Sequence, residues 1–287
     1  MAEKVYLNDK LIDADKAAIT ASDSGFLYGA GLFETMRAHK GVVFALDHHL
    51  DRLAFSARSL AIDAPYDKDY IRRAVYETLA ANGLEEARLR LTLTSGSMAV
   101  AQESRQATLL ITATRFLAYP PEFYTNGVTV ILSPYRQNPY EPTTGHKVTS
   151  YFGRMTALRL AHERRAAEAL WFTIDNRLAE GCISNVFLVK DSTLVTPPIN
   201  TPVLAGIARK ALCHIAAKES VKLVEKDLTI DDLLAADEVL LTNVIMQILP
   251  VIAVEKHSVG DGNVGPLTKK LIECFNAYIE TCCAEKK

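Results

Sequence analysis

The sequence predicts a mixed α/β (α+β) protein with two domains. A length of 287 residues corresponds to roughly two domains of about 150 residues each. Segments with the alternating pattern of strands and segments with the apolar spacing of helices occur in both halves of the chain. The Pro120-Pro121 step ends any regular element between the halves. We therefore expect a smaller first domain at residues 1–116, a linker at 117–126 and a larger second domain at 127–287.

Hydrophobic periodicity assigns the elements of the first domain. The pattern predicts a hairpin, two helices and two further strands, in order at residues 4–13, 47–62, 67–81, 87–95 and 107–114. Asp47 is the expected N-cap of the first helix. In the strand over 87–95 the leucines face one side, so Arg88 and Arg90 share the other side.

The second domain repeats this mixture of strands and helices. We expect strands at 127–133, 169–174, 185–190, 193–197, 221–226, 238–243 and 248–254, and helices at 149–166, 206–220, 229–236 and 267–282. The strands at 185–190 and 193–197 are expected to form a hairpin. A loop rich in Pro and Thr leads to His146 and Lys147 before the first of these helices.

Composition excludes several classes of function. The net charge is -2, so no basic excess points to nucleic acid or to an anionic membrane surface. Five cysteines without a C-x-x-C pair indicate neither a disulfide framework nor a zinc site, and reduced thiols in the cytoplasm are the plain interpretation. The N-terminus does not resemble a signal peptide, and the apolar stretch 239–254 is too broken to span a bilayer. No metal site is expected, because His48 and His49 are neighbours that point in different directions on a helix.

A few polar residues lie in unusual surroundings. Lys147 has no acidic residue between Glu141 and Glu163, so its amine could act as a nucleophile or base, although a solvated lysine is the simpler interpretation. Glu180 lies in an apolar segment and is either a buried, paired carboxylate or a surface residue at a loop end. Arg52 could reach an anion or extend into solvent.

Two further features could bind anions. The segment Leu204–Arg209 begins a helix after a glycine, and the N–H groups of Ile207 and Ala208 would face an anion at its N-terminus. Arg88 and Arg90 could bind a carboxylate together, or they could form the wet face of a half-buried strand.

Taken in order, these segments resemble the class IV aminotransferases, the fold type IV family of enzymes that use pyridoxal phosphate. The family includes branched-chain aminotransferases, D-amino acid aminotransferases and aminodeoxychorismate lyases. The matching stretches are DSGFLYGAGLFETMR, HHLDRLAFSA, GHKVTSY, LAEGCISNVFLV, TPPINTPVLAGIAR, ADEVLLTNVIMQILPV and VGDGNVGPLTKKL, between residues 23 and 271.

The resemblance implies how the cofactor is bound. Lys147 matches the lysine that forms the Schiff base with pyridoxal phosphate and moves a proton to and from the substrate α-carbon. Glu180 matches the acid that pairs with the pyridine nitrogen, and Arg52 matches the arginine on the phosphate. The other cofactor positions that the resemblance implies are Tyr151, Ser184, Asn185, Gly206, Ile207, Ala208, Asn243 and Val244.

The resemblance also implies the substrate side, a homodimer, and a site between the two domains. The residues implied to bind substrate are Tyr28, Phe33, Arg37, Arg88 and Arg90. Phe33 and Arg37 look like branched-chain enzymes, the chain length is nearer the D-amino acid group, and the segment 242–251 looks closer to the lyases. The expected activity is transfer of an amino group between an amino acid and a 2-oxo acid by a ping-pong mechanism. Alternatives are a lyase that forms 4-aminobenzoate and pyruvate, and a catalytically silent pyridoxal phosphate-binding scaffold.

Overall fold

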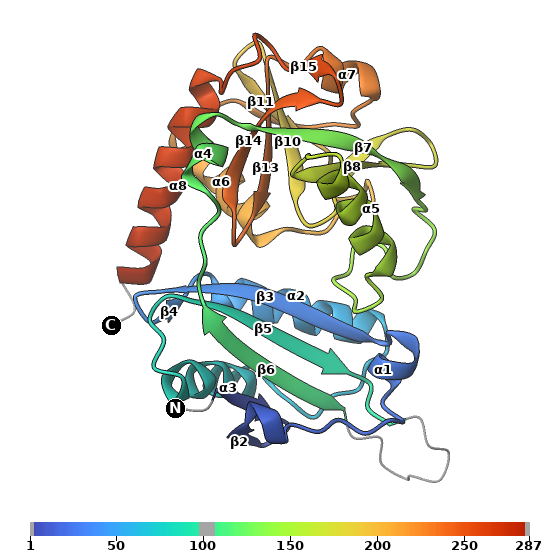
Figure 1. Cartoon of the computed structure of the whole chain (residues 1–287), viewed down its shortest axis with the longest axis vertical. Coiled ribbons are helices and arrows are strands. Elements are labelled where there is room, and N and C mark those ends of the chain that lie inside the picture. Colours follow the sequence, from blue (N-terminus) through green and yellow to red (C-terminus); the bar gives the residue numbers. More distant parts are fainter. Residues whose placement is uncertain (1–2, 98–106, 285–287) are drawn as a thin grey trace. The chain divides into compact units, whose positions relative to one another are not determined.

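The computed structural model describes residues 3–97 and 107–284 and confirms the predicted mixed α/β class (Figure 1). Contacts group the chain into two compact units. The first takes in the described parts of Met1–Leu117, His146–Tyr151 and Ile279–Lys287, and the second takes in Ala118–Gly145 and Phe152–Tyr278. The limits expected at 116 and 127 stay a prediction. Two short segments from the second half of the chain nevertheless belong to the first unit.

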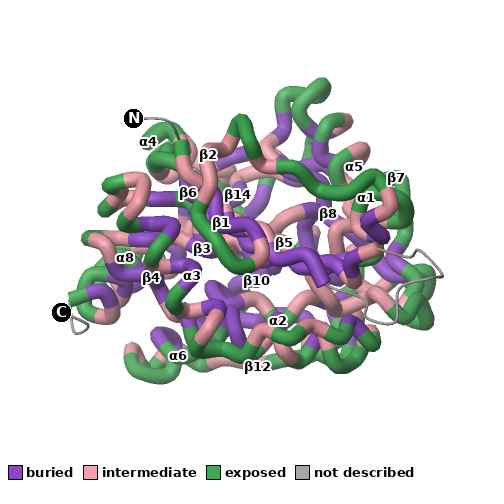
Figure 2. Tube along the Cα trace, turned by 90° about the horizontal axis from the view of Figure 1, so that it is seen from below, coloured by how far each residue is buried: buried purple, intermediate pink, exposed green. Residues whose placement is uncertain are grey.

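The first unit contains an antiparallel six-stranded sheet in the order β2-β1-β6-β5-β3-β4. Its strands are β1 (Lys4–Leu7), β2 (Lys10–Asp13), β3 (Gly31–His39), β4 (Val42–Val43), β5 (Ala87–Thr94) and β6 (Thr108–Arg115). Its helices are α1 (Ser24–Tyr28), α2 (Leu46–Ser59) and α3 (Lys68–Ala81), with a 3₁₀ turn at Ala14–Lys16. Leucines of β5 and apolar residues of α2 and α3 form one core, whereas Arg88, Arg90 and Thr92 lie on the opposite, less buried face of β5. Figure 2 shows that β3 and β5 contain many buried residues.

The second unit contains a nine-stranded mixed sheet and most of the remaining helices. The strands are β7 (Val128–Gln137), β8 (Glu168–Thr173), β9 (Leu178–Gly181), β10 (Asn185–Lys190), β11 (Thr193–Thr196), β12 (Leu223–Glu225), β13 (Glu238–Asn243), β14 (Gln247–Val254) and β15 (His257–Ser258). The helices are α4 (Pro121–Thr125), α5 (Phe152–Glu163), α6 (Ile207–Lys218) and α7 (Ile230–Leu234), and α8 (Pro266–Ala284) ends in the first unit.

The short strand β9 closes the second sheet into a ring. It pairs with β8 on one side and with β10 on the other, and the order β10-β13-β14-β7-β8-β9 returns to β10. The contact with β10 is one residue pair, Asn185 opposite Glu180. Glu180 is therefore held between two neighbouring strands.

Local structure differs from the expectations at several places. The helix expected at 149–166 begins at Phe152, because residues 147–149 pair with β3 instead. Asp47 lies inside the first turn of α2 rather than at its N-cap, since the chain enters the helix through Ala45 in the left-handed conformation, with φ 51°. The expected linker contains α4. Periodicity does not predict β3 or β9, because β9 and the start of β3 are buried on both faces and so do not alternate.

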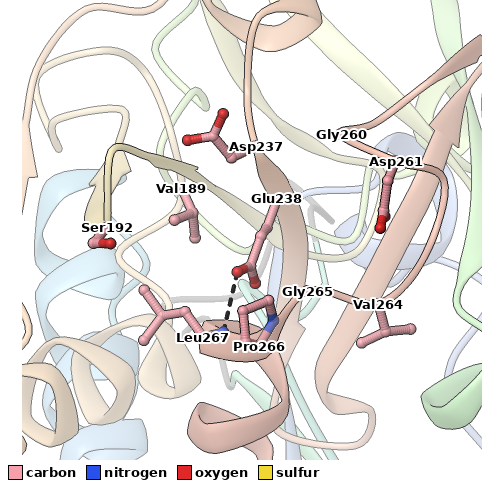
Figure 3. A pocket seen from close by; sticks show the side chains of 10 residues that line it. All are labelled: Val189, Ser192, Asp237, Glu238, Gly260, Asp261, Val264, Gly265, Pro266 and Leu267. Carbon is pink, nitrogen blue, oxygen red and sulfur yellow. Dashed lines mark hydrogen bonds between the residues drawn. The ribbon is translucent and has the colours of Figure 1, made fainter.

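A cavity of about 430 Å³ lies in the second unit, and the buried acid Glu238 is one of the residues that line it. Figure 3 shows Glu238 of β13 pointing from this cavity toward the start of α8. Its carboxylate accepts hydrogen bonds from the backbone N–H groups of Leu267, at 3.0 Å, and Thr268, at 2.7 Å. These donors have no intrahelical acceptor, so Glu238 caps the helix. None of the residues that line this cavity is a predicted site residue.

Helices long and apolar enough to cross a bilayer do not occur in the described part of the chain.

Candidate active site

The backbone around Lys147 continues the sheet of the first unit. The Phe33 N–H donates to the Lys147 carbonyl, and the Thr149 N–H donates to the Gly31 carbonyl, each at 2.8 Å. Leu32 and Val148 form the antiparallel bridge between these bonds. Lys147 therefore stands beside Phe33 in an extended segment, not at a helix start as the sequence predicts.

The Phe33 ring contacts three polar side chains of the first unit. The Lys147 Nζ lies 4.5 Å from the centre of the Phe33 ring, and the Arg90 guanidinium carbon lies 3.5 Å from it. The Tyr151 ring meets Phe33 edge-on, with 5.4 Å between the ring centres. Burial, aided by the charge of Arg88, lowers the pKa of Arg90 from its usual value. Two cations over one ring make this face of the sheet suited to an anionic group.

On the other face of β3, the buried acid Glu34 binds Arg52. Its Nε donates to Glu34 Oε1 at 2.8 Å, and its other guanidinium nitrogen lies 2.5 Å from Glu34 Oε2. His49 Nδ1 lies 2.7 Å from the same oxygen. Burial raises the pKa of Glu34, but Arg52 and His49 outweigh it and bring the pKa to about 2. Burial lowers the pKa of His49. Glu34 is not predicted from the sequence, because its only signal there is an acid inside an apolar run.

Helix α2 also fixes the residue that precedes Lys147. His146 Nδ1 lies 2.9 Å from the hydroxyl of Ser56, and the His146 ring stacks on Phe55 with 5.7 Å between centres. Helix α2 therefore positions both Arg52 and His146, the residue before Lys147.

The remaining predicted substrate residues lie away from the Phe33 ring. Arg37 stands farther along β3, with its guanidinium 4.3 Å from the Phe116 ring centre and 3.9 Å from a Glu86 oxygen. Arg88 is exposed and pairs with Arg37 across the strands. Tyr28 ends α1 and exposes 70% of its surface. Of the predicted substrate residues, the structure brings Phe33 and Arg90 together with Lys147 and Tyr151.

In the second unit Glu180 is buried and its carboxylate is paired on both oxygens. Arg154 of α5 donates to Oε1 at 2.6 Å, and the Leu204 N–H donates to Oε2 at 2.9 Å. The Arg154 guanidinium also lies 5.2 Å from the Trp171 ring centre. Glu180 is thus the paired, buried carboxylate that the sequence left open as one of two interpretations. Arg154 was not predicted, because an arginine in an amphipathic helix resembles a surface residue.

A glycine at the start of α6 creates an anion-binding geometry. Gly206 is the N-cap, and no side chain caps this end. A Cβ at position 206 would overlap the amide oxygen of Asn185, so only glycine fits. The Asn185 amide in turn donates to the Leu204 carbonyl at 2.9 Å. The N–H groups of Ile207 and Ala208 open a twelve-residue helix, where the backbone dipoles favour an anion.

A second turn of the same unit is organised by Asn243. Its side-chain oxygen accepts from the N–H groups of Ile245, at 2.9 Å, and Met246, at 2.8 Å, and its amide donates to the Ile183 carbonyl at 3.1 Å. The side chain therefore shapes the turn through Val244, which is buried. The Ser184 side chain likewise makes a hydrogen bond within the protein, because its hydroxyl donates to the Glu168 carboxyl group at 2.7 Å. Groups of His, Cys, Asp and Glu that could hold a metal ion do not occur among the described residues.

Comparison with known proteins gives one consistent result. The model of the amino-transferase class IV family matches residues 31–254. A protein of Methanocaldococcus jannaschii named "Putative branched-chain-amino-acid aminotransferase" is 35% identical over 95% of both chains, and a D-alanine aminotransferase of Staphylococcus haemolyticus is 28% identical over 97% of this chain and 98% of its own. The crystal structure of the Escherichia coli branched-chain amino acid aminotransferase has a TM-score of 0.92 at 25% identity, covering 100% of this chain and 97% of that one.

The Glu34 contacts predict a large loss of stability in Glu34→Gln. This change removes the negative charge that balances Arg52 and His49, and breaking a buried ion pair costs about 3 kcal/mol of unfolding free energy or more. Because folding lowers the pKa of Glu34, its contribution is complete above its ordinary value of 4.5 and fades as the pH falls toward 2. Urea unfolding at pH 7 and pH 4 measures both effects. The exposed Glu77→Gln on α3 is the control, and equal stability of the two variants at pH 7 would contradict the assignment.

Proposed function

Since this chain belongs to the class IV aminotransferases, a family of enzymes that use pyridoxal phosphate, we propose that it exchanges an amino group between an amino acid and a 2-oxo acid, with Lys147 as the catalytic residue. The observation that carries the proposal is the position of Lys147. Backbone pairing with β3 holds its amine beside Phe33, Arg90 and Tyr151. A fixed amine next to a carboxylate-binding arginine is what a ping-pong transamination requires.

The donor groups of the chain fit the three chemical features of pyridoxal phosphate. Arg52, the uncapped start of α6 and the turn at Asn243 and Val244 would hold the phosphate. The Glu180 carboxylate would face the ring nitrogen, and the Lys147 amine would react with the aldehyde. Gly206 makes room for the Asn185 side chain, and the absence of a side-chain cap at the start of α6 supports the binding of an anion by its backbone N–H groups. When bound, the cofactor supplies a ring that withdraws electrons from the substrate α-carbon.

Lys147 moves the proton in this proposal. Its Nζ would take the proton from the α-carbon of the amino donor and pass it to the cofactor. In the second half-reaction it would return a proton to the α-carbon derived from the 2-oxo acid. The second cation over the Phe33 ring, Arg90, binds the substrate carboxylate and orients the α-carbon toward that amine. Tyr28, Arg37 and Arg88 stay candidates for the distal part of the substrate.

Glu180 keeps the ring nitrogen protonated in this proposal. A carboxylate has about four lone-pair positions. Arg154 takes one on Oε1, and the Leu204 N–H and the Asn185 amide, at 3.4 Å, take those on Oε2. One position therefore remains on Oε1 for an N–H of the ring. A carboxylate beside the ring nitrogen favours the positively charged form of that nitrogen.

The first test measures reaction specificity together with the role of Lys147. Purified enzyme receives branched-chain L-amino acids or D-alanine as donors and 2-oxoglutarate or pyruvate as acceptors, alongside aminodeoxychorismate. We expect transamination in the wild type and no turnover in Lys147→Ala, because no other described group replaces an amine at that atom. The exposed Lys256→Ala, in the turn after β14, is expected to behave as wild type.

Two outcomes would contradict the proposal. Release of 4-aminobenzoate without transamination identifies a lyase. Bound cofactor whose absorbance does not change with any donor identifies a silent binding protein.

A change of the acid isolates the role of Glu180. Glu180→Gln keeps the size of the side chain but removes the charge, so we expect the cofactor to bind and kcat to fall by about 100-fold or more. Stopped-flow absorbance of the half-reaction measures the loss, and the exposed Glu273→Gln is the control. Wild-type turnover in Glu180→Gln would show that the ring nitrogen is not controlled by this residue.

A homodimer is part of the proposal. Helix α1 exposes three consecutive large side chains, Phe26, Leu27 and Tyr28, by 76%, 48% and 70%. Exposed apolar groups of this kind are typical of protein contacts, and a twofold axis pairs the same surface on both subunits. Sedimentation is expected to give twice the chain mass of 31.6 kDa, and Phe26→Asp is expected to weaken the dimer, unlike Leu11→Asp on β2. A wild-type monomer would contradict this part of the proposal.

The proposed location is the cytoplasm. The five cysteines all lie among the described residues, and none of them forms a disulfide bond. This number of thiols without a disulfide is typical of a reducing compartment.

A further inference from the structure

Glu168 is a buried acid that the proposed reaction does not use. It begins β8 and is 1% exposed. One carboxyl oxygen accepts from the Ile183 N–H at 2.6 Å, and the other accepts from the Ser184 hydroxyl at 2.7 Å. Both donors belong to the turn that connects β9 to β10. A buried carboxyl group that bonds only a turn has to stabilise the conformation of that turn.

The glycine that opens this turn makes room for the acid. A Cβ at Gly181 would lie 2.5 Å from Glu168 Oε1 and would also overlap the Ser184 hydroxyl. Real side chains do not approach so closely, so the carboxyl group of Glu168 takes the place of the missing side chain. Gly181 and Glu168 are thus complementary across β8 and β9.

The turn lies directly after Glu180. The Gly181 N–H donates to the Ser184 carbonyl at 2.8 Å and closes the turn, and Asn185 follows opposite Glu180 in β10. Arg154 donates to the Gly181 carbonyl at 2.7 Å while it also binds the Glu180 carboxylate. A shift of the turn would therefore move the backbone of Glu180 and its ion pair together.

We propose that Glu168 is a positioning residue that sets the direction of the Glu180 carboxylate by holding the 181–184 turn. The proposal rests on the proposed function, because it assigns Glu168 to the acid that faces the ring nitrogen. Glu168 acts through the Ile183 N–H and the Ser184 hydroxyl and touches neither substrate nor cofactor. The Ser184 hydroxyl then stabilises this turn. Ser184, one of the predicted cofactor positions, would therefore have a structural role.

The charge state of Glu168 offers an independent readout. Burial raises its pKa to about 7, although the Ile183 N–H, the Ser184 hydroxyl and Arg154 oppose this. The charged or titratable groups that act on it are Arg154 from α5, Glu180 from β9 and the Cys182 thiol of the turn. A carboxyl group with a raised pKa binds its proton more tightly in the folded chain. The stability of the chain therefore falls as the pH rises from the ordinary value of 4.5 to about 7, and is level above it.

The first arm of the test follows thermal unfolding of the full chain without added cofactor. Glu168→Gln cannot ionise, so it escapes the loss of stability that the wild type suffers as the pH rises. We expect the unfolding midpoint of Glu168→Gln relative to wild type to be about 3 °C higher at pH 8 than at pH 5.5. The control is Glu163→Gln, an exposed acid on α5, which should follow the wild type. Parallel curves for Glu168→Gln and wild type would overturn the assignment.

The second arm measures kcat and KM of the enzyme with cofactor. Glu168→Ala leaves both turn donors without their acceptor, and we expect kcat to fall about 10- to 100-fold with a smaller change in KM for the amino donor. Glu168→Gln should restore most of kcat, because its amide oxygen can accept from Ile183 and its NH₂ can donate to Ser184. Wild-type kcat in Glu168→Ala would overturn the proposal.

A second variant keeps the test decisive if Glu168→Ala does not fold. Ser184→Ala removes one of the two turn donors and is expected to lower kcat in the same way, while wild-type kcat there overturns the proposal. Absence of transamination in the wild-type enzyme would overturn the proposed function instead. The unfolding arm uses no cofactor, so it reports on the Glu168 contacts in either case.

Discussion

Two backbone hydrogen bonds to β3 determine where Lys147 lies. Residues 147–149 come from a loop of the second half of the chain, yet they pair with Gly31 and Phe33 as an added strand. Backbone pairing fixes the chain on both sides of Lys147, so the side chain has little freedom beyond its own rotamers. The Phe33 ring contacts Lys147, Arg90 and Tyr151 on one face of the sheet. The proposed function uses this aromatic surface to orient both the substrate carboxylate and the Lys147 amine.

Three buried glutamates show three ways in which a protein tolerates a carboxyl group in its interior. Glu34 is balanced by a guanidinium and an imidazole, and its pKa is about 2. Glu180 has one guanidinium, one backbone and one side-chain amide donor, which leaves room for a further donor on Oε1. Glu168 has two neutral hydrogen-bond donors, and burial raises its pKa to about 7. Since an unpaired buried charge is costly, the partners of Glu34 and Glu168 decide the direction in which the pKa of each moves.

Elements with a regular pattern follow from the sequence, and candidate site residues are predicted where the family resemblance names them. Helices α2 and α3, the first hairpin and the two-sided pattern of β5 follow from apolar spacing alone, because each element buries one face. Strand β9 and the start of β3 are buried on both faces, so they carry no alternation to detect. Arg154, Glu34 and Glu168 could not be found in this way, since their partners lie 26, 15 to 18, and 15 to 16 residues away in the chain.

The amino-acid sequence by itself determines the mixed α/β class, most elements and the chemical types available for catalysis, because periodicity and residue identity are local properties. Only the tertiary structure decides that Lys147 lies on an added strand rather than at a helix start, that β9 places Glu180 between β8 and β10, and that Glu168 fills the space left by Gly181. Each of these depends on hydrogen bonds and packing between segments distant in the chain. Such contacts are selected by the free energy of the whole fold, and no local pattern encodes them.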